Sequence, residues 1–253
     1  MSSSRLYSPY PLLSGVPVDL SENAARHAIK ALRLREGDEL VLFDGNGGEY
    51  SSRIIRIDRD RVSVMVQEWS DRECESSIAM TLVQALQAGE KMDLTVQKAV
   101  ELGVTRIVPV MSRRSVVRLS GERAQRRGVH WRAVAVSACE QCGRNRVPEI
   151  GELEDLSQWL SRPAGDGALR LMLDPFSPRT LDTLVQPKEG ACIELLIGAE
   201  GGFSPEEKVL AEQAGFIPIR LGPRVLRTET AGLAALAAIQ CLWGDFRESV
   251  VNT

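Results

Sequence analysis

The chain has 253 residues, of which 43% are hydrophobic, and a formal net charge of −3. This length suits one large domain or two smaller ones with a sizeable core. Because no run of about 18 apolar residues occurs, we expect no membrane span and no membrane partner. The N-terminal stretch lacks the basic start and continuous apolar run of a signal peptide, and five scattered cysteines favour reduced thiols over disulfides. These features predict a cytoplasmic protein.

The first part of the chain predicts β-structure. Apolar and polar residues alternate at period two across residues 38–69, as in half-buried strands. Hairpin-type residues interrupt the alternation at Asp44-Gly45, Asn46-Gly47 and Asp58-Arg59-Asp60. A short helix over 22–34, capped by Ser21, is expected to precede these strands. Several short antiparallel strands in so few residues predict a small β-barrel, and the polar, unpatterned residues 70–77 predict a linker.

After this linker, strand-like and helix-like segments alternate. The helical pattern at 90–102 ends at Gly103, and the pattern at 123–141 predicts a second helix. Ser204 and Glu207 form a capping-box pattern with Pro205 at the first helical position. Apolar runs that predict strands lie at 79–86, 106–111, 169–174, 192–198 and 216–222. Alternation of this kind predicts an α/β domain with a mostly parallel sheet.

The positive charge of the chain is concentrated in one segment. Residues 106–146 contain ten arginines and only two acidic residues, although the whole chain is acidic. The planar guanidinium fork suits phosphates and base edges. The segment therefore favours an anionic polymer as partner. The alternative is a solvated helix face that happens to be rich in arginine.

Three predicted strands end in sequences unlike plain connections. They are followed by Leu173-Asp174-Pro175, by residues 198–202 (GAEGG) and by residues 221–226 (LGPRVL). In open α/β sheets, ligands bind beyond the carboxyl ends of strands. Neither the dinucleotide pattern nor the phosphate-loop pattern is matched. The glycines allow close approach of a ligand, or they simply make a tight turn into the helix at Ser204.

Zinc and thiol chemistry are poorly supported. Cys139 and Cys142 form a single C-x-x-C pair inside a predicted helix, with no second ligand pair, and His27 and His130 are the only histidines. We expect semi-buried thiols and no metal. A thiol-redox enzyme that uses these two cysteines stays open as an alternative.

Four segments, in order, carry a resemblance to a known family. They are KMDLTVQKAVELGVTRIVPV, EQCGRNRVP, GAEGGFSPEE and LGPRVLRTETA. With them, the chain resembles the RsmE family, bacterial methyltransferases that modify N3 of a uridine in 16S ribosomal RNA and belong to the SPOUT superfamily. Two departures are visible, because the family usually has Pro at position 199 and Ser at position 142, where this chain has Ala199 and Cys142.

The resemblance implies the domain organisation. It implies a PUA-like RNA-binding β-barrel domain at residues 1–72, and a SPOUT-type α/β methyltransferase domain with a deep C-terminal trefoil knot at residues 78–247. It also implies a homodimer with its site at the subunit interface. The stretch from Thr230 to Gly244 carries no charge, so we expect a helix that is buried on all sides, by the knot or by the partner subunit.

The resemblance further implies that S-adenosyl-L-methionine binds in a bent shape between three loops. Backbone groups of an extended loop can satisfy the adenine edge, and Pro223 limits the freedom of that loop. The expected cofactor-binding residues are Leu173, Ile197, Gly198, Glu200, Gly201, Leu221, Gly222, Pro223, Val225, Leu226 and Thr228.

Methylation of uridine N3 requires the loss of a proton whose pKa lies above neutrality. A carboxylate base and a cation that stabilises the base oxygens are both plausible. We assign the cation to Arg224 or Arg227 and the base to Glu229 or Glu200. Glu229, just after Thr228, has the alternative role of complementing a helix dipole.

The partner implied by the resemblance is 16S ribosomal RNA or the small ribosomal subunit. N3 lies on the Watson–Crick edge, so the target uridine must be unpaired or flipped out. The expected RNA-binding residues are Arg33, Arg113, Arg114, Arg132, Gln141, Arg144 and Arg146. A SPOUT enzyme for another ribosomal or transfer RNA nucleotide, and a non-catalytic RNA-binding assembly factor, stay open.

Overall fold

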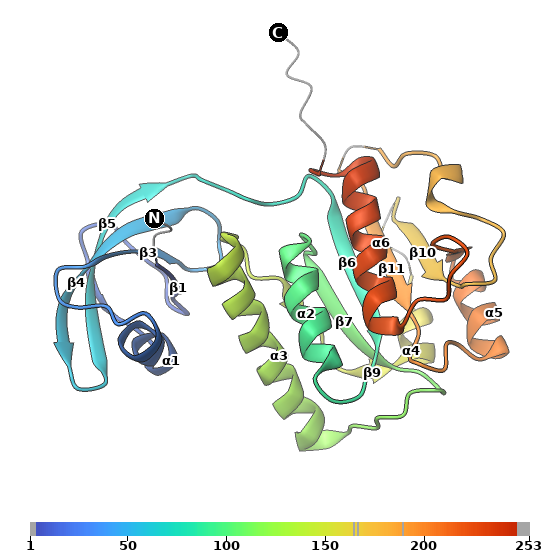
Figure 1. Cartoon of the computed structure of the whole chain (residues 1–253), viewed down its shortest axis with the longest axis horizontal. Coiled ribbons are helices and arrows are strands. Elements are labelled where there is room, and N and C mark those ends of the chain that lie inside the picture. Colours follow the sequence, from blue (N-terminus) through green and yellow to red (C-terminus); the bar gives the residue numbers. More distant parts are fainter. Residues whose placement is uncertain (1–3, 164, 166, 189, 247–253) are drawn as a thin grey trace, which may run out of the picture. The chain divides into compact units, whose positions relative to one another are not determined.

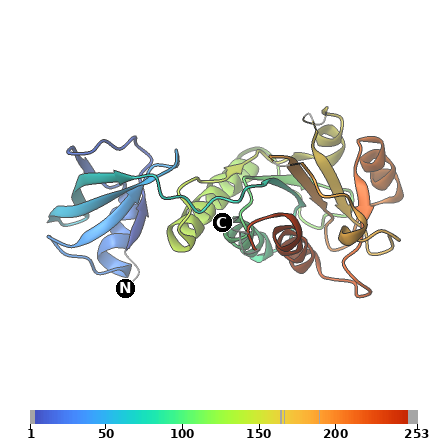
Figure 2. The same ribbon diagram turned by 90° about the horizontal axis from the view of Figure 1, so that it is seen from above.

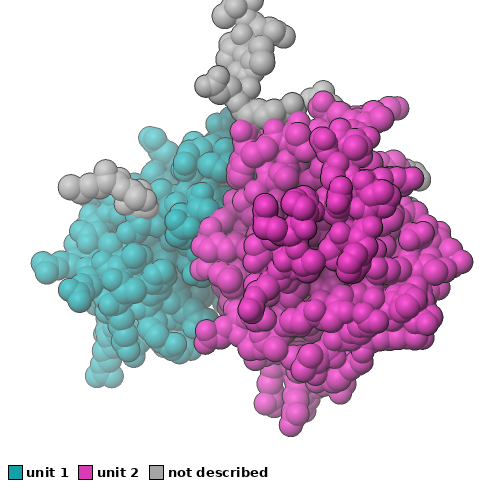
Figure 3. Space-filling view, turned by 45° about the vertical axis from the view of Figure 1, so that its right-hand side comes forward, with its two compact units in different colours: residues 1–75, 136–147 teal, residues 76–135, 148–253 magenta. Residues whose placement is uncertain are grey.

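The computed structural model describes residues 4–163, 165, 167–188 and 190–246. Two compact units make up the chain, coloured separately in Figure 3. Unit 1 contains residues 1–75 and 136–147, and unit 2 contains residues 76–135 and 148–253. Unit 1 thus includes a segment that lies far along the chain from the expected first domain. Residues 1–3, 164, 166, 189 and 247, which the expected domains include, lie outside the described residues.

Unit 1 is built on a five-stranded sheet. Its strands are β1 (Arg5–Tyr7), β2 (Pro17–Asp19), β3 (Glu39–Phe43), β4 (Glu49–Asp58) and β5 (Arg61–Ser70). Their order is β1-β3-β4-β5-β2, with β1 parallel to β3 and the other pairs antiparallel. The predicted turns connect β3 to β4 and β4 to β5, where Arg59 takes a left-handed φ of 52°.

One helical segment packs on this sheet. It comprises α1 (Glu22–Arg26) and a π-helical turn, η1 (His27–Ala31), and the Ser21 side chain accepts a hydrogen bond from the N–H of Ala24. The predicted helix is therefore present but ends earlier, because Arg33 adopts a left-handed φ of 55°. Ala25 and Ala28 face a core that also contains Leu6, Leu12, Leu40, Leu42, Ile54, Val62, Val64 and Val66.

The late segment 136–147 is bound into unit 1 by buried polar contacts. Arg144 pairs with Glu75, at 2.6 Å from Nη2 to Oε2, and its side chain is only 4% exposed. Asn145 donates to the carbonyl of Arg72, and Glu140 accepts from the N–H of Tyr7. The prediction that Arg144 contacts RNA is corrected here, because its guanidinium is buried against Glu75.

Replacing Arg144 with Met leaves the Glu75 carboxylate without its guanidinium in a largely buried place. We expect a loss of about 3–5 kcal/mol in the free energy of unfolding, measured by urea denaturation. Removing one partner of a buried ion pair leaves the other charge buried and uncompensated. The matched control is Arg53→Met, which removes an exposed pair with Glu39 in the same unit. That control should lose less than about 1 kcal/mol. Equal losses in the two variants would contradict the structural role of Arg144.

Unit 2 contains the predicted parallel sheet (Figure 1). Its strands are β6 (Ala79–Ala85), β7 (Arg106–Met111), β8 (Glu149–Ile150), β9 (Glu154–Asp155), β10 (Leu169–Leu173), β11 (Cys192–Ile197) and β12 (Ile217–Ile219). The order is β12-β10-β11-β6-β7-β8, all pairs are parallel, and β9 also pairs with β7. All five strand-like runs form strands, so this prediction is confirmed.

Helices cover both faces of this sheet (Figure 2). They are α2 (Lys91–Glu101), α4 (Leu156–Leu160), α5 (Pro205–Gln213) and α6 (Thr228–Trp243), with a 3₁₀ turn η2 (Leu181–Thr183). The long helix α3 (Gly121–Cys142) begins in unit 2, and its residues from 136 onward belong to unit 1. Helices α4 and α5 contact each other and share a core with alternate strand residues such as Val83 and Leu196. Helices α2 and α6 contact each other, and α6 also contacts β11. Among the described residues, no helix is long and apolar enough to cross a membrane.

The capping box of α5 forms as predicted. Ser204 Oγ accepts from the N–H of Glu207, while Glu207 Oε2 accepts from the N–H of Ser204 at 2.8 Å. Glu207 Oε1 also accepts from the backbone N–H of Arg113, at 2.7 Å. One buried carboxylate therefore fixes the start of α5 and joins it to the loop after β7.

Candidate functional site

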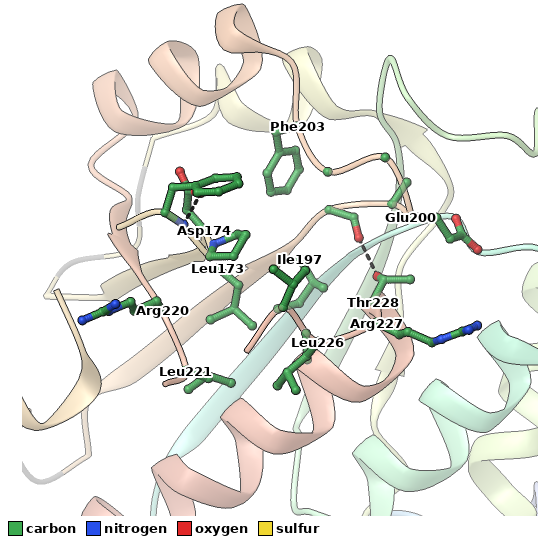
Figure 4. A pocket seen from close by; sticks show the side chains of 18 of the residues that line it. Leu173, Asp174, Ile197, Glu200, Phe203, Arg220, Leu221, Leu226, Arg227 and Thr228 are labelled. Atoms are coloured by element: carbon green, nitrogen blue, oxygen red, sulfur yellow. Dashed lines mark hydrogen bonds between the residues drawn. The ribbon is translucent and has the colours of Figure 1, made fainter. Parts of the chain in front are cut away.

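A cavity of about 480 Å³ lies in unit 2 where β10, β11 and β12 end and α6 begins. Three loops surround it, one after each strand, and they include the three strand ends identified in the sequence (Figure 4). The carboxyl edge of a parallel sheet is where such folds bind ligands. This volume is typical of pockets for small molecules.

Apolar side chains form much of the cavity wall. Ile197 and Leu226 lie between Arg220 on one side and Glu200 on the other in Figure 4. Leu173, Phe203, Ile219 and Leu221 complete this apolar surface. Val225 also lines the cavity, and its side chain is exposed at the mouth.

Two glycines of the loop after β11 have close neighbours. A Cβ added at Gly198 would lie 3.2 Å from the backbone of Gly202, and one added at Gly201 would lie 3.1 Å from Cβ of Arg114. Arg114 also donates from Nη1 to the carbonyl of Gly201, at 2.9 Å. The loop therefore presents mostly backbone to the cavity and is held by Arg114, an arginine that the sequence assigns to RNA and that also lines the cavity.

The first residue of α6 holds this loop in place. Thr228 Oγ1 donates to the carbonyl of Gly198 at 2.5 Å, drawn as a dashed line in Figure 4. The same hydroxyl accepts from Gln84 Nε2 at 3.2 Å and from Gln87 Nε2 at 3.4 Å. Thr95 then donates to Gln87 Oε1. The Thr228 hydroxyl is thus bound within the protein, and Thr228 also lines the cavity, so its role as a cofactor contact stays a prediction.

Two carboxylates and one lysine meet on the cavity wall. Lys91 Nζ lies 3.4 Å from Glu200 Oε1 and 3.5 Å from Glu229 Oε1. Partial burial disfavours the charged form of Glu200, but the N–H groups of Glu200 and Ala88 and the Lys91 ammonium outweigh it, so the pKa of Glu200 lies below its usual range. The Glu229 side chain is 15% exposed, and its Oε2 is buried with no hydrogen-bond partner among the described residues.

Cations outnumber acids around the cavity. Six cationic side chains line it, namely Lys91, Arg114, Lys208, Arg220, Arg224 and Arg227, against three acidic ones, Asp174, Glu200 and Glu229. Arg224 and Arg227 are exposed, and no ion pair of either is recorded in the described part of the chain. The rim is therefore electropositive, as an anionic ligand requires.

Of the expected site residues, most line this cavity and a few do not. All four expected catalytic residues do so, as do the expected cofactor residues other than Gly222 and Pro223. Those two residues are exposed at the tip of the loop, where Gly222 has a left-handed φ of 69°.

The expected RNA-binding residues divide between the units. Arg114 lines the cavity, while Arg113 is exposed and paired with Glu206. Arg132 is exposed on α3 within unit 2. Of the expected RNA-binding residues in unit 1, Arg33, Gln141 and Arg146 are exposed. With Arg144 buried, six of the seven keep a side chain outside the core.

Sequence reasoning missed several cavity residues. Lys208 pairs with Asp174, at 2.6 Å from Nζ to Oδ2, and lies 5.9 Å from the ring of the exposed Phe176. Lys91 begins the helix that follows β6, next to β11 in the sheet. Applying the strand-end rule to β6 as well would have identified Lys91. No local pattern marks Lys208, which reaches the cavity from inside α5.

The cysteine pair lies in α3, where Cys139 is buried and Cys142 is half-buried. Burial is the main cause that raises the pKa of the Cys139 thiol to about 12. Such a thiol is not the ionised nucleophile that redox chemistry needs. Among the described residues, no three His, Cys, Asp or Glu side chains gather as a metal site requires.

Comparisons with known proteins agree with this geometry. A family model described as "RNA methyltransferase domain" matches residues 74–240, and one described as "RNA methyltransferase PUA domain" matches residues 20–66. Fold and cavity are thus those of an RNA methyltransferase with a PUA domain.

Individual relatives identify the family of RNA methyltransferases to which the chain belongs. Ribosomal RNA small subunit methyltransferase E of Buchnera aphidicola (subspecies Schizaphis graminum) is 35% identical, over 95% of this chain and 97% of the relative. The same enzyme of Bacillus subtilis is 32% identical, over 84% of this chain and 85% of the relative. The chain belongs to the ribosomal RNA small subunit methyltransferase E family.

Solved structures support the same family. The methyltransferase E of Neisseria gonorrhoeae, bound to S-adenosyl methionine, is 38% identical with a TM-score of 0.90, covering 97% of this chain and all of that chain. A methyltransferase of Legionella pneumophila with bound cofactor SAM is 37% identical with a TM-score of 0.92, at the same coverage.

Replacing Thr228 with Val removes the donor to Gly198 and leaves the amides of Gln84 and Gln87 without their shared acceptor. We expect a loss of about 1–3 kcal/mol in the free energy of unfolding, because buried groups left unpaired are costly. Urea denaturation followed by circular dichroism measures it. Thr230→Val, an exposed position in the same helical turn, is the control and should change stability little. A Thr228→Val variant with the wild-type free energy of unfolding would contradict the role of the Thr228 hydroxyl in holding the loop.

Proposed function

We propose that this protein transfers a methyl group from S-adenosyl-L-methionine to N3 of one uridine in 16S ribosomal RNA of the small ribosomal subunit. The observation that carries the proposal is the cavity of unit 2, with its backbone-lined loops, apolar wall and cationic rim. Membership in the methyltransferase E family supports the substrate class, and the relatives' names supply the small-subunit RNA.

The residues present suit the cofactor. Apolar side chains of Leu173, Ile197 and Leu226 would hold the adenosine part, with backbone groups of the loop from Leu221 to Leu226 at the adenine edge. The carboxylates suit a ligand that carries a positive sulfur and an ammonium group. When bound, S-adenosyl-L-methionine supplies a methyl group made electrophilic by the positive sulfur, to which the bonding electron pair returns.

The chain must remove the N3 proton and stabilise the charge that remains. Glu229 lines the cavity, and its Oε2 is buried with no hydrogen-bond partner among the described residues, so this oxygen is available to accept a proton. We therefore assign the base to Glu229. Negative charge spreads onto the uracil oxygens, and the exposed Arg224 and Arg227, which line the cavity, are the proposed cations there.

RNA binding is assigned to five arginines and one glutamine whose side chains lie outside the core. Arg113, Arg114 and Arg132 in unit 2, and Arg33, Gln141 and Arg146 in unit 1, are the proposed contacts. Arginine contacts to phosphate release counterions, so affinity for RNA should fall as salt rises. We propose that the enzyme works in the cytoplasm, on RNA or on an assembled subunit.

A homodimer is the proposed assembly, and α6 supports it. Within one chain this helix is not buried on all sides as expected, because Thr230 and Cys241 are exposed and Ala234 and Ala237 are half-buried. An uncharged helix face of this kind favours contact with a partner subunit.

The trefoil knot stays a prediction. Its support is that the chain passes from β12 at the sheet edge to Thr228, which bonds with Gly198 and Gln84 near the sheet centre.

The function is tested by mapping the modified nucleotides of ribosomal RNA from a strain that lacks this protein. We expect loss of a single N3-methyluridine from 16S RNA, restored by the gene. Loss of a different methylated nucleotide would favour another SPOUT activity. Calorimetry with S-adenosyl-L-methionine separates a further alternative, since an absence of binding would indicate a non-catalytic assembly factor.

Arg224→Ala and Arg227→Ala test the cation. Removing a group that stabilises charge only in the transition state should lower kcat by about 10²-fold in at least one of the two variants. The dissociation constant for S-adenosyl-L-methionine, measured by calorimetry, should change little. Arg162→Ala, an exposed arginine paired with Glu154 outside the cavity, is the control and should keep wild-type turnover. Full turnover in both cavity variants would make the assignment wrong.

Cys241→Arg tests the dimer. The position is exposed within one chain, so the fold should tolerate the arginine, while a charge on the α6 face should weaken subunit association. Sedimentation equilibrium should give twice 27.8 kDa for the wild type and a smaller mass for the variant. A wild-type protein that sediments at 27.8 kDa would contradict the proposal.

A further inference from the structure

The lysine that joins the two cavity carboxylates has no role in the proposals above. Its Nζ lies between Glu200 Oε1 and Glu229 Oε1, at 3.4 and 3.5 Å. The three residues come from different elements: Lys91 is the first residue of α2, Glu200 lies in the loop after β11, and Glu229 is the second residue of α6. All three line the cavity.

This arrangement solves an electrostatic problem. Glu200 and Glu229 bind the same ammonium group, so without it two negative charges would share one partly buried wall. Like charges in a shared site disfavour ionisation, so loss of the ammonium would favour a protonated carboxyl. A carboxyl that already holds a proton cannot accept one from uridine N3. Among the described residues, Lys91 is the cation that lies between Glu200 and Glu229.

Glu229 shows how the lysine orients its partner. Oε1 faces Lys91, whereas Oε2 is buried and has no hydrogen-bond partner among the described residues. A buried acceptor left unpaired is costly and calls for an explanation. The explanation we infer is that Glu229 Oε2 accepts a proton from a bound ligand.

We propose that Lys91 is a positioning residue of the methyltransferase. Its ammonium keeps Glu200 and Glu229 ionised together and fixes Glu229 so that the carboxylate accepts the N3 proton of the target uridine. In this step the N3–H bond breaks, the proton passes to Glu229, and its electron pair stays on N3 for the bond to the methyl carbon. The inference rests on the proposed function of this cavity.

The first arm of the test needs neither cofactor nor RNA. The Lys91→Met variant and the wild type are unfolded thermally across the pH range 3–8. The pKa of Glu200 is lowered in the folded protein, so its contribution to stability is present above the ordinary carboxyl pKa and is lost as pH falls through the folded value. We expect Lys91→Met to melt below the wild type at pH 7 and the difference to shrink towards pH 3, as both carboxylates become protonated.

Two comparison variants identify the cause. Lys91→Arg keeps the cation and should restore most of the melting temperature. Lys98→Met, on the same helix, breaks a lysine–glutamate pair with Glu101 outside the cavity and should leave methyl transfer unchanged. A difference between Lys91→Met and the wild type that is constant with pH would indicate a packing role for the lysine and overturn the inference.

The second arm measures single-turnover methylation of 16S RNA against pH. For Lys91→Met we expect at least a tenfold fall in rate at pH 7 and an acid limb moved to higher pH, because a base next to an uncompensated carboxylate ionises later. Binding of S-adenosyl-L-methionine, measured by calorimetry, should persist, and Lys91→Arg should recover much of the rate. A wild-type profile in Lys91→Met overturns the inference. A wild type that does not methylate uridine instead refutes the proposed function, and the pH-dependent melting still reports on the lysine.

Discussion

A hydrogen bond from the Thr228 hydroxyl to the Gly198 carbonyl joins the start of the last helix to the loop after β11. Two buried glutamines, Gln84 and Gln87, donate to the same hydroxyl, so the tie also includes the end of the central strand β6 and the turn beyond it. The loops on either side of the cavity are thereby held relative to one another. Their backbone groups can then meet a ligand without first being ordered, which lowers the entropic cost of binding.

Local patterns were sufficient for most of the fold. Apolar runs predicted every strand of the parallel sheet longer than two residues, and the capping-box pattern predicted the start of α5 at Ser204. The two-residue strands β8 and β9 and the short helix α4 carry too few residues for a periodic signal. The end of the first helix was also missed, because the left-handed turn at Arg33 uses a residue that rarely adopts that conformation.

Part of the candidate site was also predictable from local patterns, and part was not. The strand-end rule found the loops around the cavity, since the rule depends only on sequence order and sheet direction. The partners of each charge depend on contacts between distant segments, which no local pattern records. Arg144 and Arg146 are two positions apart, yet the first is buried on Glu75 and the second is exposed. Equally, nothing near Lys91 in the sequence indicates Glu200 or Glu229.

The composition of unit 1 has a consequence for the order in which the protein can be completed during synthesis. This unit needs residues 136–147, which leave the ribosome only after some sixty residues of unit 2 have been made. Until then Glu75, Arg72 and the N–H of Tyr7 lack the side chains that bind them in the finished protein. The N-terminal strands therefore reach their final packing only once α3 has been made. A fragment that stops at the end of the first sheet would lack part of its own structure.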